Sequence, residues 1–473
     1  MNTVFIKNKS CNSGRSSTFI LSLLMLFIIE YGFSQNKLLT LDQALQTAEA
    51  NYPAIKAKMM YTKSAEQNLK ETKREYIPAL KLSGQINYGT ANSVTGTFFP
   101  YGIVVPTSGG ISGENNYNGV YGAIAMSYLE WAPFSFGQYK AKVNESKIQL
   151  DYANADATQE IFYNKISASQ AYFNLLVFHE LRMAQDNNVK RAEVIKKIVT
   201  EVTKNGLRPG VDSSFANAEL SRAKLELLDA IKGEYEGQKQ LADMMGISYQ
   251  EFTLDTNLFL NKMPVIKIDQ TNQNISNHPL IKLYDTRIQL SQSKEVVILR
   301  NYFPKISLLG VTNGRGSGIA SNGTYDQSFS SGTSLTQFNY AGAVACTFNI
   351  MDYPRMKAEL NAEKMKTEAT KAEYDEQSIK LKNELLLADE KLKLAIARSK
   401  ETPIQYASAM DTYKQKLAMY NSGLSTLLDV AQSLYNLNKA EADLAVTYNN
   451  VWNALLYKAA TTGDINLLLN STK

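Results

Sequence analysis

The stretch REYIPALKLSG, residues 74–84, decides the fold because the spacing of its apolar residues changes at Pro78. Residues 41–75 have the period of an amphipathic helix, whereas apolar and polar residues alternate beyond the proline. The apolar positions are Leu80, Leu82, Ile86 and Tyr88, and the polar ones are Lys81, Ser83, Gln85 and Asn87. This period of two predicts a strand with one apolar and one polar face. Because proline disfavours the α conformation in the residue before it, Pro78 predicts a helix-to-strand transition.

The same transition recurs at NYFPKISLLG, residues 301–310, around Pro304, and both belong to an internal repeat. NYPAIK at 51–56 matches NHPLIK at 277–282, at an offset of 226 (277 minus 51). Further along, an offset of 217 (429 minus 212) aligns Gly206-Leu207 with Gly423-Leu424, Asp212 with Asp429 and Gly246 with Gly463. A chance match of two helical segments would not keep prolines, glycines and aspartates aligned. The pattern predicts two structural repeats, 35–262 and 263–473, the second ending in a C-terminal segment.

Each repeat is predicted to contain a helix, a strand, a Gly/Ser/Asn-rich loop and a returning strand, with the loops at about 90–118 and 313–335. A very long helix follows between Gly137 and Gly206, and again between Pro354 and Gly423. About 65 helical residues would extend roughly 100 Å. The apolar positions Leu381, Leu385, Ala388, Leu392 and Ala395 are spaced as in a coiled coil. A shorter helix then returns, in the first repeat from about residue 212 to 245.

The returning strands also alternate, and their apolar residues are expected on one side, opposite the small and polar ones. These positions are Val120, Gly122, Ile124, Met126 and Tyr128 in the first repeat and Phe338, Tyr340, Gly342, Val344, Cys346 and Phe348 in the second. Two-faced strands of about ten residues are typical of a transmembrane β-barrel. Four strands are too few to close, so a threefold assembly with twelve strands is predicted. The alternative is a soluble four-stranded sheet beside a coiled coil, which would need a helical layer over its apolar face.

Residues 1–34 have the features of an export signal, with Lys7, Lys9 and Arg15 before the apolar core 19–29 and cleavage expected after Ser34. Without this segment, 47 basic residues (50 minus 3) and 44 acidic residues (45 minus Glu30) remain. The resulting charge of +3 is too weak to indicate nucleic-acid binding. The rest of the chain has no run of about 18 apolar residues, so no helix is expected to cross a membrane.

Residues suited to chemistry are scarce. Beyond the signal Cys346 is the one cysteine, so no internal disulfide is expected, and Cys11 precedes the apolar core, which argues against a lipid anchor. A buried or lipid-facing position is expected for Cys346. His179 has no ligand partner at helical spacing, and His278 precedes Pro279, where packing or capping is expected. The glycines of 314–318 precede a loop rather than the helix of a dinucleotide motif. No catalytic residue, metal ligand or cofactor is predicted, and hence no enzyme.

Five motifs together resemble the outer membrane efflux proteins, the TolC-like channels, over residues 38–470. They are LTLDQALQTAEANYPAIKAK, REYIPALKLSG, FGQYKAK, YNSGLSTLLDVAQSLYNLNKAEADL and LLYKAATTGDI. The resemblance implies a homotrimer in the outer membrane of a Gram-negative bacterium. Its twelve-stranded β-barrel would contact outer membrane lipid and continue as a coiled-coil α-helical barrel across the periplasm. A belt of mixed structure would include residues near 247–275 and 464–473.

The resemblance also implies a passive exit duct of a tripartite efflux or type I secretion system. An inner-membrane RND or ABC transporter would deliver the cargo through a periplasmic adaptor protein. Because the transporter would select the cargo, the sequence leaves it open. The alternative from another class is a periplasmic coiled-coil adaptor or scaffold. Such adaptors carry one hairpin within compact β-domains, whereas here each of two hairpins follows a pair of strands.

The turns between the long helices are candidate sites for docking the adaptor. Gly206 and Gly423 suit the positive φ at a helix end. Leu207 and Leu424 follow these glycines and are expected to contact the adaptor, as the resemblance implies. The alternative is an ordinary helix C-cap in which each leucine packs locally.

The second turn is also a candidate constriction of the periplasmic entrance. Asp429 and Tyr420 match by position the residues that the family uses there, and Asp212 aligns with Asp429 in the other repeat. The sequence departs from the family's pattern at two positions, where Ser425 replaces an arginine and Gln432 replaces an aspartate. Fewer charged residues are therefore expected at this constriction. A ring of aspartates would select for cations. The alternative role of Asp429 is an N-cap of the returning helix.

Overall fold

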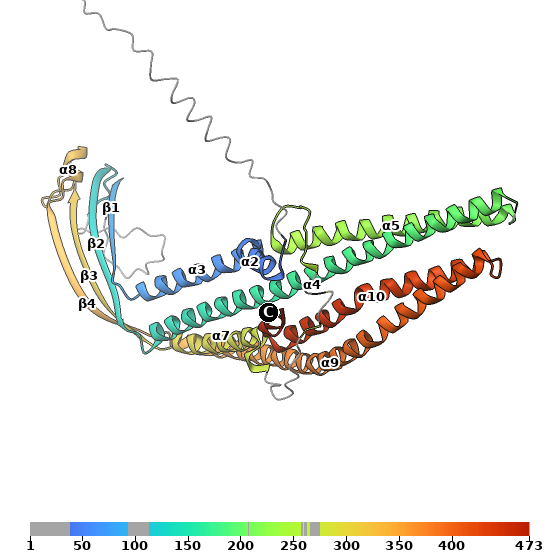
Figure 1. Cartoon of the computed structure of the whole chain (residues 1–473). Helices are drawn as coiled ribbons and strands as arrows, with labels where there is room; N and C mark the ends of the chain where they lie inside the picture. The colour runs from blue at the N-terminus through green and yellow to red at the C-terminus, as the bar shows by residue number, and fades with distance from the viewer. Residues whose placement is uncertain are drawn as a thin grey trace, which may run out of the picture.

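A computed structural model shows an elongated molecule, with a four-stranded sheet at one end and two long helical hairpins reaching away from it (Figure 1). It describes residues 38–92, 113–206, 208–256, 259, 263–264 and 275–472. The predicted signal segment and the predicted boundary between the repeats lie outside the described residues. In these ranges no helix is both long and apolar enough to cross a membrane.

The first set of elements begins at Thr40, which forms a capping box with Gln43 at the start of α2. Pro53 opens α3 in its first turn, where a missing N–H leaves no hydrogen bond unmade. The elements are α2 (Leu41–Asn51), α3 (Pro53–Arg74), β1 (Ala79–Gly89), β2 (Val120–Phe134), α4 (Gln138–Lys204) and α5 (Gly210–Met245). Gly246 ends α5 with a φ of 66°, a left-handed conformation that glycine adopts without strain.

The second set of elements follows the same order. It comprises η1 (Ile275–Asn277), α7 (Pro279–Asn301), β3 (Lys305–Ser317), β4 (Gln337–Thr347), η2 (Ile350–Asp352), α9 (Tyr353–Asn421), α10 (Leu427–Thr462), α11 (Asn466–Leu469) and η3 (Asn470–Thr472). The loop predicted at 313–335 is shorter than expected because β3 extends to Ser317, and it contains the short helix α8 (Phe329–Thr333). The side chain of Ser328 caps α8, which stabilises a helical turn in a Gly/Ser-rich segment.

The four strands are antiparallel and lie in chain order, β1-β2-β3-β4, and their register assigns each side chain to one of two faces. The apolar face carries Leu80, Leu82, Ile86 and Tyr88 of β1, Tyr121, Ala123, Ala125, Ser127 and Leu129 of β2, Leu308, Gly310 and Thr312 of β3, and Phe338, Tyr340, Gly342, Val344 and Cys346 of β4. Its large side chains are exposed, with Leu82 at 78% and Tyr340 at 88%. Such exposure is incompatible with the helical layer that a soluble sheet would need.

The apolar residues of the second strand share one side, as predicted, but that side belongs to the polar face of the sheet. Ile124, Met126 and Tyr128 pair with Gln85, Ser83 and Lys81, so they lie on the polar face of the sheet. The other side of β2 carries small residues such as Ala123 and Ala125. Neither side of this strand is strongly polar, so only the register with its neighbours decides which side faces out. The prediction for 338–346 is correct, because these residues share the face of Leu80 and Leu82.

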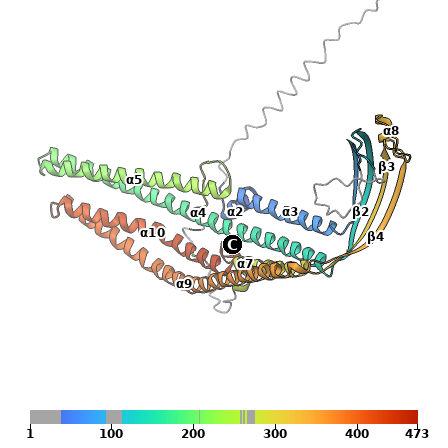
Figure 2. The same cartoon turned by 180° about the vertical axis from the view of Figure 1, so that it is seen from behind.

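The long helices α4 and α9 contain 67 and 69 residues, so each spans roughly 100 Å. Each pairs with the returning helix of its own repeat, α5 or α10, and both hairpins have their turns at the end of the molecule opposite the sheet (Figure 2). The predicted coiled-coil positions Leu381, Leu385, Ala388 and Leu392 are buried. Leu392 belongs to the core that includes α10, whereas Leu381 packs with Ile275 and Ile281 at the start of α7. The predicted seam of α9 is therefore shared between two neighbouring helices.

The largest hydrophobic core lies in the middle of the molecule, where α2, α4, α5 and α10 meet. Phe173, Phe259 and Trp452 are buried there, with ring centroids 5.0–6.4 Å apart. Residue Leu254 forms a parallel bridge with Leu39, and Leu468 of α11 is buried in the same core. Leu254 and Leu468 thus attach their segments to the core at the middle of the molecule.

Candidate functional site

A proline marks each junction between helix and sheet. Pro78 lies directly before β1, and Pro304 lies directly before β3. Helix α3 ends four residues before Pro78 at Arg74, and α7 ends at Asn301. Because the residue before a proline is disfavoured in the α conformation, each helix is stopped before the strand begins. The structure therefore places both prolines at the transitions that the sequence predicted.

Aromatic rings surround both junctions. The ring of Tyr76 lies 6.0 Å from that of Trp131 and 5.1 Å from that of Tyr139, and Trp131 Nε1 donates a hydrogen bond to the Tyr76 carbonyl oxygen (3.0 Å). In the second repeat Tyr302 contacts Phe348 and Tyr353, at 5.2 and 5.7 Å between centroids. Aromatic side chains with polar groups are enriched where a membrane meets water. The junctions thus have the composition of a membrane interface.

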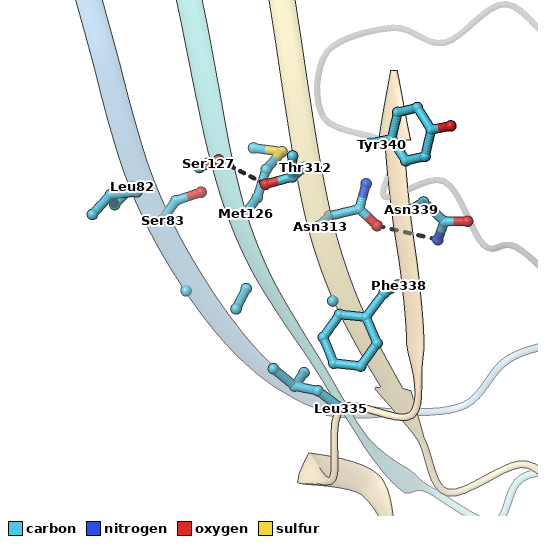
Figure 3. Close-up of a pocket in the computed structure, with 13 residues that line it drawn as sticks. Leu82, Ser83, Met126, Ser127, Thr312, Asn313, Leu335, Phe338, Asn339 and Tyr340 are labelled. Atoms are coloured by element: carbon cyan, nitrogen blue, oxygen red, sulfur yellow. Dashed lines mark hydrogen bonds between the residues drawn. The ribbon is translucent and has the colours of Figure 1, made fainter. Parts of the chain in front are cut away.

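A shallow depression of about 690 Å³ lies on the sheet (Figure 3). Small residues such as Ala125 and Gly314 line it, and Phe338 packs over Gly314, where an added Cβ would lie 3.0 Å from the ring. On this apolar face Ser127 and Thr312 bond to each other with a hydrogen bond of 2.7 Å. The residues that line the depression come from both faces of the sheet and include no charged side chain.

The turn between α9 and α10 is a glycine-capped helix end followed by an exposed leucine. Gly423 has a φ of 78°, and its N–H donates to the carbonyl of Tyr420 (3.0 Å). The Leu424 N–H donates to the carbonyl of Met419 (2.8 Å), as in a Schellman motif. The Leu424 side chain is 74% exposed, so it does not pack locally against the helix. Gly206 has the equivalent φ of 71°, whereas Leu207 lies outside the described residues.

Asp429 lies at the third position of α10 and not at its N-cap, where the alternative interpretation placed it. The N-cap is Thr426, whose Oγ1 accepts a hydrogen bond from the Asp429 N–H (3.2 Å). In return Asp429 Oδ2 accepts from the Thr426 N–H (3.1 Å), completing a capping box, and also from Ser425 Oγ (3.0 Å). The bonds from Thr426 and then Ser425 hold the pKa of the Asp429 carboxyl below its usual range. Asp429 is therefore charged at neutral pH and stabilises the start of α10.

Tyr420 and Asp212 come together at the hairpin turns, with Arg208 as a third member. Tyr420 is buried, which raises its pKa; nearby Asp212 raises it further, and Arg208 acts in the opposite direction. Arg208 Cζ lies 5.1 Å from the centroid of the Tyr420 ring, and Arg208 Nη2 donates to the Ser425 carbonyl oxygen (3.4 Å). Arg208 therefore links the turn of the first hairpin to that of the second within one chain.

Sequence reasoning missed Arg208, although the repeat contained the signal for it. Arg208 lies 217 residues before Ser425 (425 minus 208), which is the offset of the repeat. When the repeats are aligned, Arg208 therefore corresponds to Ser425, the residue that stands where the family has an arginine. Arg208 of the first repeat thus places a basic group beside the turn of the second hairpin. The cluster therefore contains one more charged residue than the sequence analysis expected.

The two histidines make structural contacts. His179 Nδ1 lies 2.8 Å from Glu234 Oε1, and Arg182 Nε lies 2.5 Å from Glu234 Oε2, so this carboxylate joins α4 to α5. His278 caps α7: its Nδ1 accepts from the Leu280 N–H (3.1 Å), and its Nε2 lies 3.0 Å from the Ala460 carbonyl oxygen. Within the part of the chain that the structure describes, no group of three or more His, Cys, Asp and Glu side chains could hold a metal ion.

The sequence matches one known family over nearly half of its length. Residues 44–246 match the family described as "Outer membrane efflux protein". This range runs from α2 to the end of α5 and so covers one complete set of elements. Among curated proteins no sequence matches the chain significantly.

Solved structures of outer membrane channels have the same fold. Helices and strands superpose on CusC with a TM-score of 0.75 at 12% identity, covering 90% of this chain and 92% of CusC. For CmeC of Campylobacter jejuni the TM-score is 0.73 at 16% identity, covering 91% of this chain and 86% of CmeC. For VceC of Vibrio cholerae it is 0.71 at 15% identity, covering 90% and 96%. The likeness shows the fold: four antiparallel strands joined to long helices.

Proposed function

Because residues 44–246 match the outer membrane efflux protein family and the chain has the fold of TolC-like channels, we propose that three copies form the exit duct of a tripartite efflux or type I secretion system. The chain is an outer membrane efflux channel with a periplasmic helical domain, and not an enzyme. In the proposed system, cargo from an inner-membrane RND or ABC transporter passes through a periplasmic adaptor into the helical hairpins and leaves through the barrel.

The observation that carries this proposal is that the four-stranded sheet is open, with an unpaired edge on each side. In the strand order β1-β2-β3-β4, both β1 and β4 have one free edge, and the apolar side chains on one face are exposed. Each unpaired backbone group in lipid costs several kcal/mol, so an open sheet of this kind is unstable in a membrane. Pairing β4 of one copy with β1 of the next removes every edge when three copies supply twelve strands. The resulting barrel is wide enough to keep an open lumen.

Exposed apolar side chains on the hairpins support the same assembly. Ile379, Leu386 and Leu394 of α9 are 60%, 57% and 69% exposed, and their spacing of seven and eight residues places them on one stripe of the helix. This stripe is separate from the buried seam at Leu381 and Leu385. Leu225 and Leu228 of α5 are exposed as well, at 63% and 60%. Stripes of this kind are suited to coiled-coil contacts with neighbouring copies.

The hairpin turns are the proposed place of contact with the adaptor and of closure. We assign adaptor docking to Gly423 and Leu424 in one turn and to Gly206 and Leu207 in the other. Asp429, Asp212 and Tyr420 are assigned to the constriction, now together with Arg208. The clustering of Arg208, Tyr420 and Asp212 and the negative charge of Asp429 support this assignment.

The proposal is tested by isolating the protein from membranes. Native mass measurement of the detergent-extracted protein should give a trimer, and the trimer should produce discrete currents in planar bilayers. A folded monomer inserted in the outer membrane would contradict the shared barrel. A soluble protein, or one in the inner membrane, would favour the adaptor or scaffold alternative.

A further inference from the structure

The polar face of the sheet has an excess of positive charge. Lys81, Lys305 and Arg315 lie on this face, and Glu130 is its one acidic residue within the four strands. In a closed barrel the polar face lines the lumen, because the apolar face contacts lipid. Each chain therefore contributes a net charge of +2 to the lumen wall (3 minus 1). With three copies, each of these residues forms a ring of three.

These charges have few opposite partners nearby. The ion pairs of the described residues include none of Lys81, Lys305, Arg315 and Glu130. Among the connections at the far end of the sheet, 93–112 contains no charged residue in its sequence, and the described parts contain Glu114 and Asp326. Asp326 Oδ1 accepts a hydrogen bond from the Ser328 N–H (2.9 Å), which directs this carboxylate into its own turn. The wall between the two ends of the barrel thus remains basic.

The same face contains an apolar strip along β2 that runs between the basic residues. Tyr128 and Val311 lie in the row of Lys81, Ile124 lies in the row of Arg315, and Met126 lies in the row between them. Their side chains are half-buried by neighbours on the sheet. The rows of Lys81 and Arg315 are four residues apart, about 14 Å at 3.4 Å per residue. Along β2 an apolar strip of Ile124, Met126 and Tyr128 therefore runs between the two rings of cationic groups, and in its middle row it is flanked by the polar residues Ser83, Asn313 and Asn339.

We propose that the barrel lumen favours amphipathic organic anions, with the apolar body on Ile124, Met126 and Tyr128 and the anionic group near Lys81 or Arg315. This inference rests on the proposed function, because the polar face surrounds a lumen only in the closed trimer. A basic wall in a narrow passage concentrates anions, and desolvation of an apolar body adds to their residence there. The inference concerns the barrel and is separate from the acidic residues at the hairpin turns.

The test uses two probes with the same apolar body and opposite charge. In planar bilayers 1-pyrenesulfonate and 1-pyrenemethylammonium are added on the extracellular side of single channels, and the concentration that interrupts the current is measured. The anion should act at a concentration about tenfold lower than the cation. Inorganic sulfate should be much weaker than pyrenesulfonate, because it lacks the apolar body.

Variants assign the effect to the proposed residues. The double variant Lys81→Gln/Arg315→Gln should lose the preference for the anion, whereas the charge-conserving Lys81→Arg/Arg315→Lys should keep it. Glu130→Gln should strengthen the preference. Equal block by both pyrene probes, or equal block by sulfate and pyrenesulfonate, would overturn the inference while the channel itself is intact. Absence of any current from the wild-type protein would instead contradict the proposed function.

Discussion

Two equivalent glycines fix where the returning helices end. Gly246 and Gly463 have φ values of 66° and 76°. A Cβ added to Gly246 would lie 2.8 Å from Tyr52 Cα, and one added to Gly463 would lie 2.8 Å from His278 Cδ2. The end of each returning helix thus packs against the residue that precedes the first-turn proline of α3 or α7. Glycine is needed at these positions for two reasons, its backbone conformation and the lack of space.

These two reasons can be separated by comparing Gly463→Ala with Gly423→Ala. Gly423 has a similar φ of 78°, but no atom lies within 4 Å of its added Cβ. The left-handed conformation alone costs alanine about 1 kcal/mol, so Gly423→Ala should lower stability slightly. Gly463→Ala should lower it distinctly more, because His278 must also move. Thermal unfolding followed by circular dichroism measures both, and equal losses would show that the space at Gly463 adapts freely.

His278 should make stability depend on pH. Burial lowers its pKa, although its hydrogen bond with Ala460 and the charge of Glu384 act in the opposite direction. Because the folded chain takes up this proton less readily than the unfolded chain, stability falls as pH decreases from about 6.5 towards the lowered pKa of His278. In addition, protonated Nδ1 can no longer accept the hydrogen bond of the Leu280 N–H.

The variant His278→Asn tests this dependence, since asparagine keeps an acceptor for the helix N-terminus and does not titrate. The fall in unfolding temperature between about pH 7.5 and pH 5.5 should be smaller in this variant than in the wild-type protein. His179→Asn is the matched control, because His179 is half-buried between α4 and α5, where its Nδ1 lies beside Glu234 and not at a helix N-terminus. An unchanged pH profile in His278→Asn would contradict the assignment.

At the scale of elements, local signals predicted what local forces determine. The prolines, the glycine caps and the two apolar periods gave the order of helices and strands, because each acts within a few residues. The faces of β2 required the register with β1 and β3, which depends on residues far apart in the sequence. Helix α8 depends on one side-chain cap at Ser328. The contact of Arg208 with Tyr420 joins two hairpins, so no local pattern could reveal it.

The joined hairpin turns should resist opening through Arg208. Arg208→Ala removes the contact with the Tyr420 ring and the hydrogen bond to the Ser425 carbonyl. A cation–π contact at an exposed site is worth about 0.5–1 kcal/mol, so the open fraction of the channel should rise about two- to fivefold. Single-channel recordings measure this fraction.

Arg222→Ala is the matched control for Arg208→Ala. Arg222 lies on α5 with its Cζ 5.7 Å from the ring centroid of Tyr435, so the substitution removes a similar contact away from the turns. The control should leave the open fraction unchanged. If the open fraction of the channel rises equally in both variants, Arg208 acts through the general stability of the hairpins and not through its contacts at the turn.

At the scale of the whole molecule, the sheet and the hairpins depend on the same assembly. The sheet has free edges at β1 and β4, and the hairpins have exposed apolar stripes on α5 and α9. A threefold arrangement would cover both at once, since one symmetry axis would run through the barrel and the helices. The helical contacts lie far from the membrane and can therefore bring the strands together before the barrel closes. Insertion of the sheet should thus depend on side chains that never touch lipid.

This dependence predicts the behaviour of the double variant Leu386→Asp/Leu394→Asp. Both leucines lie on the exposed stripe of α9, and burying each in a neighbour's surface contributes about 2 kcal/mol. Three copies would lose six such side chains and would gain six carboxylates at the interface, where unpaired charges are costly. The trimer should therefore be lost. Because the barrel needs twelve strands, the variant should also be absent from the outer membrane, although β1 to β4 are unchanged.

Leu424→Asp separates assembly from docking in the same experiment. Leu424 is exposed to a similar degree, 74%, but lies at the hairpin turn beyond the proposed interface between copies. This variant should form heat-modifiable trimers in the outer membrane and should fail in export, because the proposed adaptor contact is disrupted. Electrophoresis of heated and unheated membrane fractions gives the trimer content of each variant. Normal trimers from Leu386→Asp/Leu394→Asp would show that the exposed stripe of α9 serves another contact, since a carboxylate buried between copies cannot leave their association intact.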